Sequence, residues 1–145
     1  MHKIIATGLG IGYMGKGSGT AAALCCCVIW YLSGGNSFGT IMFTIVITAV
    51  GVWSATVVEQ YWGIDSSRVV IDEIAGMCIS LLFLPVTLIN VAFAFILFRF
   101  FDIIKPLYIG KAENLPGGWG VMADDVLAGI YTNVILQVAI RFLLN

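Results

Sequence analysis

The sequence predicts an all-α, compact helical membrane protein, in which a helical hairpin, a shorter bent segment and a final helix surround an interfacial acidic site. Hydrophobic residues make up 60% of the chain and charged residues only 10%, against about 25% charged residues in an ordinary soluble domain. The few charges gather in short stretches that separate long apolar segments, and no segment alternates with the period of a strand. The 145 residues are expected to form one domain, 1–145.

The charge balance argues against a nucleic-acid partner. Seven basic and eight acidic side chains nearly cancel, and no run of basic residues could neutralise a phosphate backbone. Cys25, Cys26, Cys27 and Cys78 all lie inside apolar segments, so we expect them to fill space in the core rather than bind a metal or form disulfides. Glycines and Lys16 interrupt the N-terminal apolar stretch, which argues against a cleaved signal peptide.

The first predicted element is a helical hairpin. Residues 17–58 contain no Asp, Glu, Lys, Arg or His, and the sequence SGGNS at Ser33–Ser37 divides them into two segments near the ~20 residues that span a bilayer. Because a hairpin returns to its starting side, Lys16 and the charged stretch Glu59–Glu73 are expected on the same side of the membrane.

The next apolar segment allows two topologies. Residues 74–98 are also uncharged and are interrupted by Pro85. A continuous helix over them would be roughly 37 Å long, enough for one crossing but not for two. The segment therefore either spans once or forms a shallow bent pair. We favour the bent alternative, because it brings the charged stretch Arg99–Asp125 to the side that holds Glu59–Glu73.

The last two elements are a loop and a final helix. Proline and the glycine cluster Gly117, Gly118 and Gly120 predict a loop before Asp125, and Val126–Asn145 is predicted as the final helix. Asn133 and Gln137, four residues apart in that helix, could line an ion path or hydrogen-bond between helices, and we favour the hydrogen bonds.

Three motifs place charged side chains beside apolar segments: VVIDEIAG at Val69–Gly76, FRFFDIIKP at Phe98–Pro106 and GGWGVMADDVLAG at Gly117–Gly129. Each has an ordinary interpretation, such as an interfacial ion pair, a snorkelling lysine or a carboxylate that caps a helix. Together they supply five carboxylates with few cations nearby, a pattern that favours a site for a hard divalent ion such as Mg²⁺. The carboxylates belong to Asp72, Glu73, Asp102, Asp124 and Asp125.

These three motifs, with IATGLGIG at Ile5–Gly12, resemble the signature segments of the phosphatidylglycerophosphatase A family. Its members are bacterial Mg²⁺-dependent lipid phosphatases that convert phosphatidylglycerophosphate to phosphatidylglycerol. The resemblance implies an integral protein of the bacterial inner (cytoplasmic) membrane with a phospholipid substrate and an active site facing the cytoplasm. It also implies that the five carboxylates hold Mg²⁺, that one of them deprotonates water or attacks phosphorus itself, and that the phosphate is bound by Arg99, Lys105, Lys16, Thr20 and Gly118.

One segment departs from the family pattern. The family commonly has Pro-Gly-Thr and a later glycine here, whereas GKGSGTAAA at Gly15–Ala23 has Ser18 and Ala22 at those positions and adds Lys16.

Two other functional classes are alternatives to a phosphatase: a small ion or proton transporter, and a non-catalytic membrane assembly subunit. The acids lie at segment edges rather than at midspan, which argues against transport, and an assembly subunit has no need of five clustered carboxylates.

Overall fold

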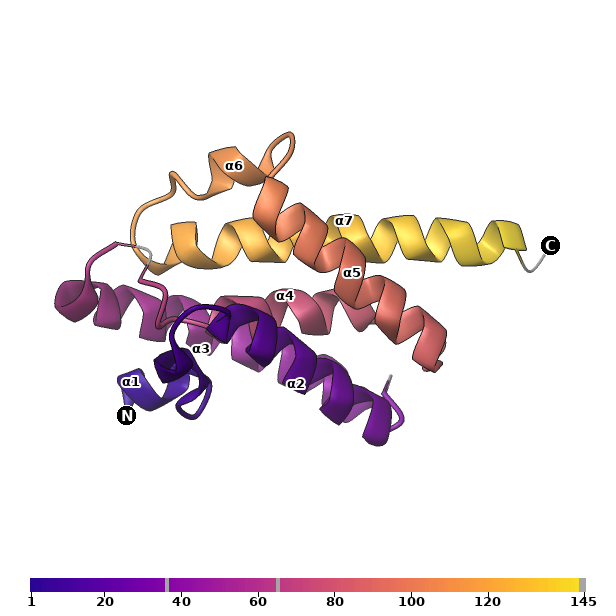
Figure 1. Ribbon diagram of the computed structural model, residues 1–145, viewed down its shortest axis with the longest axis horizontal. Helices are drawn as coiled ribbons and strands as arrows, with labels where there is room; N and C mark the ends of the chain where they lie inside the picture. The colour runs from indigo at the N-terminus through magenta and orange to yellow at the C-terminus, as the bar shows by residue number, and fades with distance from the viewer. Residues whose placement is uncertain (36, 65, 144–145) are drawn as a thin grey trace.

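The computed structural model describes residues 1–35, 37–64 and 66–143, and within these ranges the chain is helical with no strand, as predicted. Figure 1 shows the helices packed side by side, with the C-terminal end of α7 extending beyond the other helices. In chain order the elements are α1 (His2–Ala6), the 3₁₀ turn η1 (Ile11–Met14), α2 (Ser18–Leu32), α3 (Phe38–Trp62), α4 (Ile71–Leu81), α5 (Leu88–Ile104), α6 (Ile109–Ala112) and α7 (Gly118–Leu143).

The predicted hairpin is formed by α2 and α3, but its two arms differ in length. α2 has 15 residues and α3 has 25, so α2 is about 22 Å long and shorter than the ~30 Å hydrocarbon core. The prediction of two near-spanning arms was wrong for α2. Ser37 starts α3 by accepting a hydrogen bond from the Thr40 amide at 3.2 Å, and residue 36 of the predicted turn lies outside the described residues.

Among the described residues, α3 and α7 are the helices long and apolar enough to cross a membrane. Their apolar side chains face outward over much of their length, as in a helix that contacts lipid rather than a soluble core. These two helices and the composition agree with the prediction of a membrane protein.

The segment around Pro85 bends back, as we favoured. α4 ends at Leu81, and after the break α5 starts at Leu88 with Thr87 as its cap, whose Oγ1 accepts from the Asn90 amide at 3.2 Å. The Asn90 side chain donates to the Pro85 carbonyl at 2.9 Å and so closes the bend. α5 then runs back across α4 (Figure 1), which places its C-terminal end beside the N-terminal end of α4.

α7 begins at Gly118, well before the predicted start at Val126. Glycine disfavours a helix in isolation, but here the missing side chain lets the first turn pack against α3, because a Cβ at Gly118 would overlap the Val52 carbonyl. The Gly118 amide also donates to Thr56 Oγ1 at 2.9 Å. Asp124 therefore lies about two turns inside the helix, and the interpretation that it caps the helix was wrong.

Close approach of α4 and α7 fixes the centre of the fold. A Cβ at Gly129 would overlap the Gly76 carbonyl, and one at Gly76 would lie 2.6 Å from the Phe98 ring. The Asn133 side chain donates to the carbonyls of Ser80 and Leu82 at 3.1 and 2.7 Å, and that of Gln137 donates to Asn133 Oδ1 at 2.7 Å. The favoured role, a hydrogen bond between helices, is confirmed for Asn133, whereas Gln137 bonds within α7 and supports the Asn133 side chain.

The cysteines behave largely as expected. Cys26, Cys27 and Cys78 are buried in the core between α2 and α4, while Cys25 is exposed, and all four are free thiols. The space-filling role is thus seen for the three buried residues.

Candidate active site

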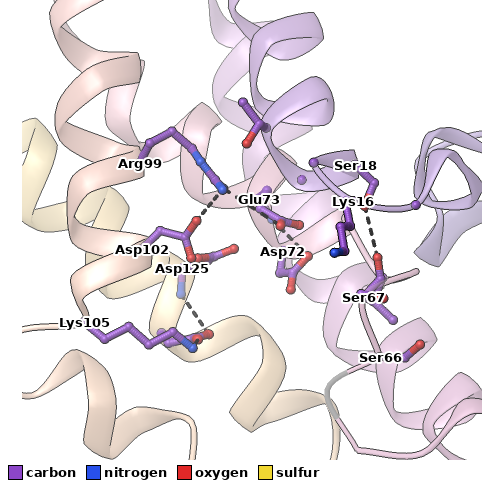
Figure 2. A pocket seen from close by; sticks show the side chains of 16 residues that line it. Lys16, Ser18, Ser66, Ser67, Asp72, Glu73, Arg99, Asp102, Lys105 and Asp125 are labelled. Atoms are coloured by element: carbon purple, nitrogen blue, oxygen red, sulfur yellow. Dashed lines mark hydrogen bonds and ion pairs between the residues drawn. The ribbon is translucent and has the colours of Figure 1, made fainter.

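A cavity of about 510 Å³ lies where α2 and α4 begin and α5 ends, with α7 closing one side. We call it the acidic cavity (Figure 2). Because α4 and α5 are antiparallel, the second motif reaches the same end of the molecule as the first. The cavity is lined by nine of the predicted site residues: Asp72, Glu73, Asp102, Asp124, Asp125, Arg99, Lys105, Lys16 and Thr20.

One predicted residue lies elsewhere. Gly118 is not part of the cavity lining, and its amide is used by the hydrogen bond to Thr56. It was expected in a loop beside the phosphate because glycine clusters usually form turns. Since Gly118 instead starts α7 against α3, its amide cannot serve as a phosphate ligand in this arrangement.

Three carboxylates form the innermost group. Asp72, Glu73 and Asp125 each offer an oxygen, and these oxygens all lie within 4.8 Å of one another. Glu73 Oε2 and Asp125 Oδ1 are buried without a hydrogen-bond partner among the described residues. A buried carboxylate oxygen without a partner is costly, and a hard divalent cation supplies what such oxygens lack. The group can therefore hold a metal ion.

The electrostatics of α4 agree with this interpretation. Burial raises the pKa of Asp72 well above its usual range, and the neighbouring carboxylates of Glu73 and Asp125 raise it further. Burial also raises the pKa of Glu73, although the hydrogen bond with Asp72 and the charge of Arg99 oppose the rise. Without a cation, these acids thus resist ionisation, and a bound cation would favour the ionised form.

Arg99 lies between two of the acids. It pairs with Asp102 one turn along α5, and its Nη1 is 4.0 Å from Glu73 Oε1 on α4. The three-residue spacing in the second motif predicted that these side chains share a face of the helix. The ordinary ion pair is thus present, and it holds the guanidinium at the wall of the acidic cavity (Figure 2).

Lys105 bridges two acids from different elements. Its Nζ donates to Asp124 Oδ2 at 2.7 Å and to Glu113 Oε2 at 2.8 Å. Burial lowers the pKa of Lys105, but the hydrogen bonds to Asp124 and Glu113 outweigh burial and raise it overall. The ammonium therefore stays charged. Glu113 was missed by the sequence analysis, because it lies in a stretch predicted to be an irregular loop.

The glycine-rich segment forms the opposite wall. Gly17, with φ 89°, precedes α2, and no side chain caps this helix. The Ser18 amide donates to the Gly15 carbonyl at 3.1 Å, and the next amides of the first turn have no carbonyl partner within the helix. Ser18 is buried, and its hydroxyl donates to the Ser67 carbonyl at 3.0 Å. The serine that replaces the family's proline thus ties this wall to the chain before α4. In Figure 2, Lys16 lies across the cavity from Arg99 and Lys105.

The chain is similar to known lipid phosphatases along most of its length. The profile of the family described as Phosphatidylglycerophosphatase A matches residues 4–140. A Bacteroides thetaiotaomicron protein provisionally named phosphatidylinositol-3-phosphatase is 43% identical in an alignment that covers 94% of this chain and 91% of that protein.

Two further relatives are named phosphatidylglycerophosphatase A. The Haemophilus influenzae protein is 34% identical, with 96% of this chain and 88% of the relative covered. The Escherichia coli protein is 32% identical, with 92% and 80% covered. No solved structure matches the chain significantly.

Proposed function

We propose that this chain, which belongs to the phosphatidylglycerophosphatase A family, hydrolyses the terminal phosphomonoester of phosphatidylglycerophosphate in an Mg²⁺-dependent reaction. The family and its named members make the chain a lipid phosphatase; the substrate and the metal are what the proposal adds. The observation that supports it best is that Asp72, Glu73 and Asp125 converge within 4.8 Å in a cavity that also holds Arg99 and Lys105.

The reaction requires positive charge around a phosphate dianion. Asp72, Glu73 and Asp125 would hold Mg²⁺, which when bound supplies charge to the phosphate oxygens and lowers the pKa of a water molecule. Arg99 binds phosphate oxygens through its planar guanidinium, and Lys105 contributes a point charge. Lys16 and the first-turn amides of α2 that follow Ser18 bind from the opposite wall, where a helix N-terminus favours an anion.

The other two carboxylates have a positioning role in this proposal. Asp102 holds the guanidinium of Arg99, and Asp124 holds the ammonium of Lys105. Both cations are therefore fixed before the substrate arrives, which removes part of the cost of ordering them in the transition state. One carboxylate of the acidic cavity accepts the proton of the attacking water.

We also propose that the protein lies in the bacterial inner membrane with the acidic cavity at the cytoplasmic surface. The cavity lies toward the end of α3 and the start of α7, at one end of both candidate spans. Basic residues gather toward that end, which suits the cytoplasmic side. They are Lys16 and Lys105 in the cavity lining, Lys3 and Arg68 beside the Trp62 ring at the end of α3, and Lys111 in α6.

The name of one relative indicates a second candidate substrate, which should be compared directly with phosphatidylglycerophosphate. The protein with 43% identity bears the name of a phosphatidylinositol-3-phosphatase. Both lipids carry a phosphomonoester beyond a phosphodiester, so the same phosphate site could serve either. They differ in the group that links the two phosphates, a glycerol in one and an inositol ring in the other.

The test is an assay of released phosphate. Purified protein in detergent with Mg²⁺ is supplied in parallel with phosphatidylglycerophosphate, phosphatidylinositol 3-phosphate and phosphatidate. We expect the highest kcat/KM for phosphatidylglycerophosphate. A higher value for phosphatidylinositol 3-phosphate would replace the proposed substrate with the second one, and no release from any of the three lipids would contradict the proposed reaction.

A further inference from the structure

An apolar groove of about 310 Å³ runs between α2 and α5, separate from the acidic cavity. Its floor contains the buried side chains of Cys27 and Val91. Its walls are more exposed and include Leu24 and Val28 on α2 and Ile96 on α5. This apolar surface is therefore concave.

The groove lies next to the acidic cavity along the same two helices. On α2, Thr20 lines the cavity and Leu24, one turn later, lines the groove. On α5, Arg99 lines the cavity and Ile96, one turn earlier, lines the groove. Residues three or four apart lie on one face of a helix, so one face of each helix borders both spaces. Figure 1 shows α2 and α5 running away from their cavity ends toward the same side of the molecule.

We propose that this groove binds one acyl chain of the lipid substrate while the phosphate lies in the acidic cavity. The inference rests on the proposed function, since it takes the substrate to be a lipid phosphomonoester. A ligand that is charged at one end and apolar along its length matches a charged cavity and an apolar groove that follow each other along the same two helix faces. From Thr20 to Tyr31 the groove side of α2 extends roughly 16 Å, about half of the hydrocarbon core.

This arrangement predicts that chain length affects binding. When an acyl chain binds in the groove, the apolar surfaces of both the chain and the groove lose contact with water or detergent. This interaction is the same in the ground state and the transition state. Loss of such uniform binding raises KM and leaves kcat nearly unchanged. A lipid with very short chains does not reach the groove and is insensitive to changes there.

The test fills the groove with a side chain. Ala92, an exposed residue of the α5 wall, is changed in Ala92→Trp, and the matched control is Ala49→Trp at an exposed position of α3 outside the groove. We compare kcat/KM for dipalmitoyl- and dibutyryl-phosphatidylglycerophosphate. Ala92→Trp should lower the ratio of long-chain to short-chain kcat/KM at least ~10-fold, about 1.4 kcal/mol, through KM. An unchanged ratio, or an equal fall in Ala49→Trp, overturns the proposal.

A second measurement keeps the inference independent of turnover. A phosphatidylglycerophosphate analogue with a non-hydrolysable phosphonate and a photoreactive group in one acyl chain is bound and irradiated. Labelling of residues 24–32 and 88–96 that is lost in Ala92→Trp supports the groove as the binding site of the acyl chain. This result would hold even if the wild-type protein released no phosphate and the proposed reaction failed. Labelling spread over α3 and α7 instead overturns it.

The groove could otherwise be covered by a second copy of the chain. The alternative is tested with Val28→Cys in a background without the four native cysteines. The protein is oxidised in detergent and in vesicles, and a disulfide between two copies would indicate that the groove faces a second chain. We expect the protein to stay monomeric under conditions in which the thiol reacts with a small maleimide. Efficient disulfide-linked dimerisation through position 28 would overturn the proposal in favour of a protein interface.

Discussion

Gly19 of α2 packs directly against the carboxylate of Glu73 on α4. A Cβ at position 19 would overlap Glu73 Oε1. The glycine thus lets the start of α2 approach the acidic group, and it connects the wall of the phosphate cavity to one of the three carboxylates that can hold a metal. Any side chain at this position must displace either the helix or the carboxylate.

The first prediction follows from this contact. Gly19→Ala should lower kcat/KM by about 10-fold or more, because a shift of Glu73 misplaces a group that acts only in correct geometry. The matched control is Gly39→Ala, a helical position of α3 at which a Cβ meets, among the described residues, only Ser37 Oγ at 3.5 Å. Phosphate release is measured on protein that elutes as the wild type does. Equal activity in both variants would show that the contact has no role in the reaction.

The sequence predicted the features that depend on local pattern. Uncharged runs located the hairpin, and the three-residue spacing of the second motif placed Arg99 and Asp102 on one face of a helix. The bend at Pro85 was favoured because the motifs needed to meet, and the Asn90 hydrogen bond to the Pro85 carbonyl shows how the chain makes it.

The features that the sequence did not predict depend on contacts between separate elements. α7 starts at Gly118 because of Thr56 on α3, 62 residues away, and glycine propensity alone indicates the opposite. The Ser18 hydroxyl bonds a carbonyl 49 residues away. Glu113 reaches Lys105 only because α5 and the following loop bring them together. No local period or motif reports contacts of this kind.

The second prediction concerns the metal. Chelation with EDTA should abolish phosphate release and added Mg²⁺ should restore it, since Glu73 and Asp125 have buried oxygens without a partner among the described residues. Ca²⁺ is larger and accepts irregular coordination, so it should restore the rate poorly. Full activity after exhaustive chelation would contradict a metal-dependent mechanism.

The third prediction concerns the membrane topology. Single cysteines at Ser67 and Asn114, in a background without native cysteines, should react with an impermeant thiol reagent from the same side of sealed vesicles. A cysteine at Ser33 should react from the other side, because α3 separates Ser33 from Ser67 and is long enough to span. All three positions are exposed. Reaction of Ser67→Cys and Asn114→Cys from opposite sides would contradict the shared cavity.

The fourth prediction uses the raised pKa of Asp72. Burial favours its protonated form in the folded protein, so the folded state binds more protons than the unfolded state, and the free energy of unfolding falls as pH rises above ~3.9 toward the raised pKa. Without metal, Asp72→Asn should therefore gain stability relative to wild type as pH rises through this window. The thermal unfolding midpoint in detergent with EDTA measures it.

Added Mg²⁺ should reverse this pH trend in the stability difference between Asp72→Asn and wild type. Mg²⁺ binds the ionised carboxylates, so its stabilisation of the wild type should grow with pH, whereas Asp72→Asn should gain much less. A difference between variant and wild type that does not change with pH, with or without Mg²⁺, would show that Asp72 neither titrates in this window nor contributes to metal binding.

The last prediction separates the two adjacent acids of α7. Asp125 belongs to the group that can hold a metal, whereas Asp124 accepts a hydrogen bond from Lys105. Asp125→Asn and Asp124→Asn are nearly isosteric, and each should lower the rate at least ~10²-fold, about 2.7 kcal/mol of barrier. Only Asp125→Asn should also weaken the stabilisation by Mg²⁺, because Asp124 acts through the ammonium. Glu59→Gln, outside the acidic cavity, is the control. Rates near wild type in both variants would show that the carboxylates of Asp124 and Asp125 have only a structural role.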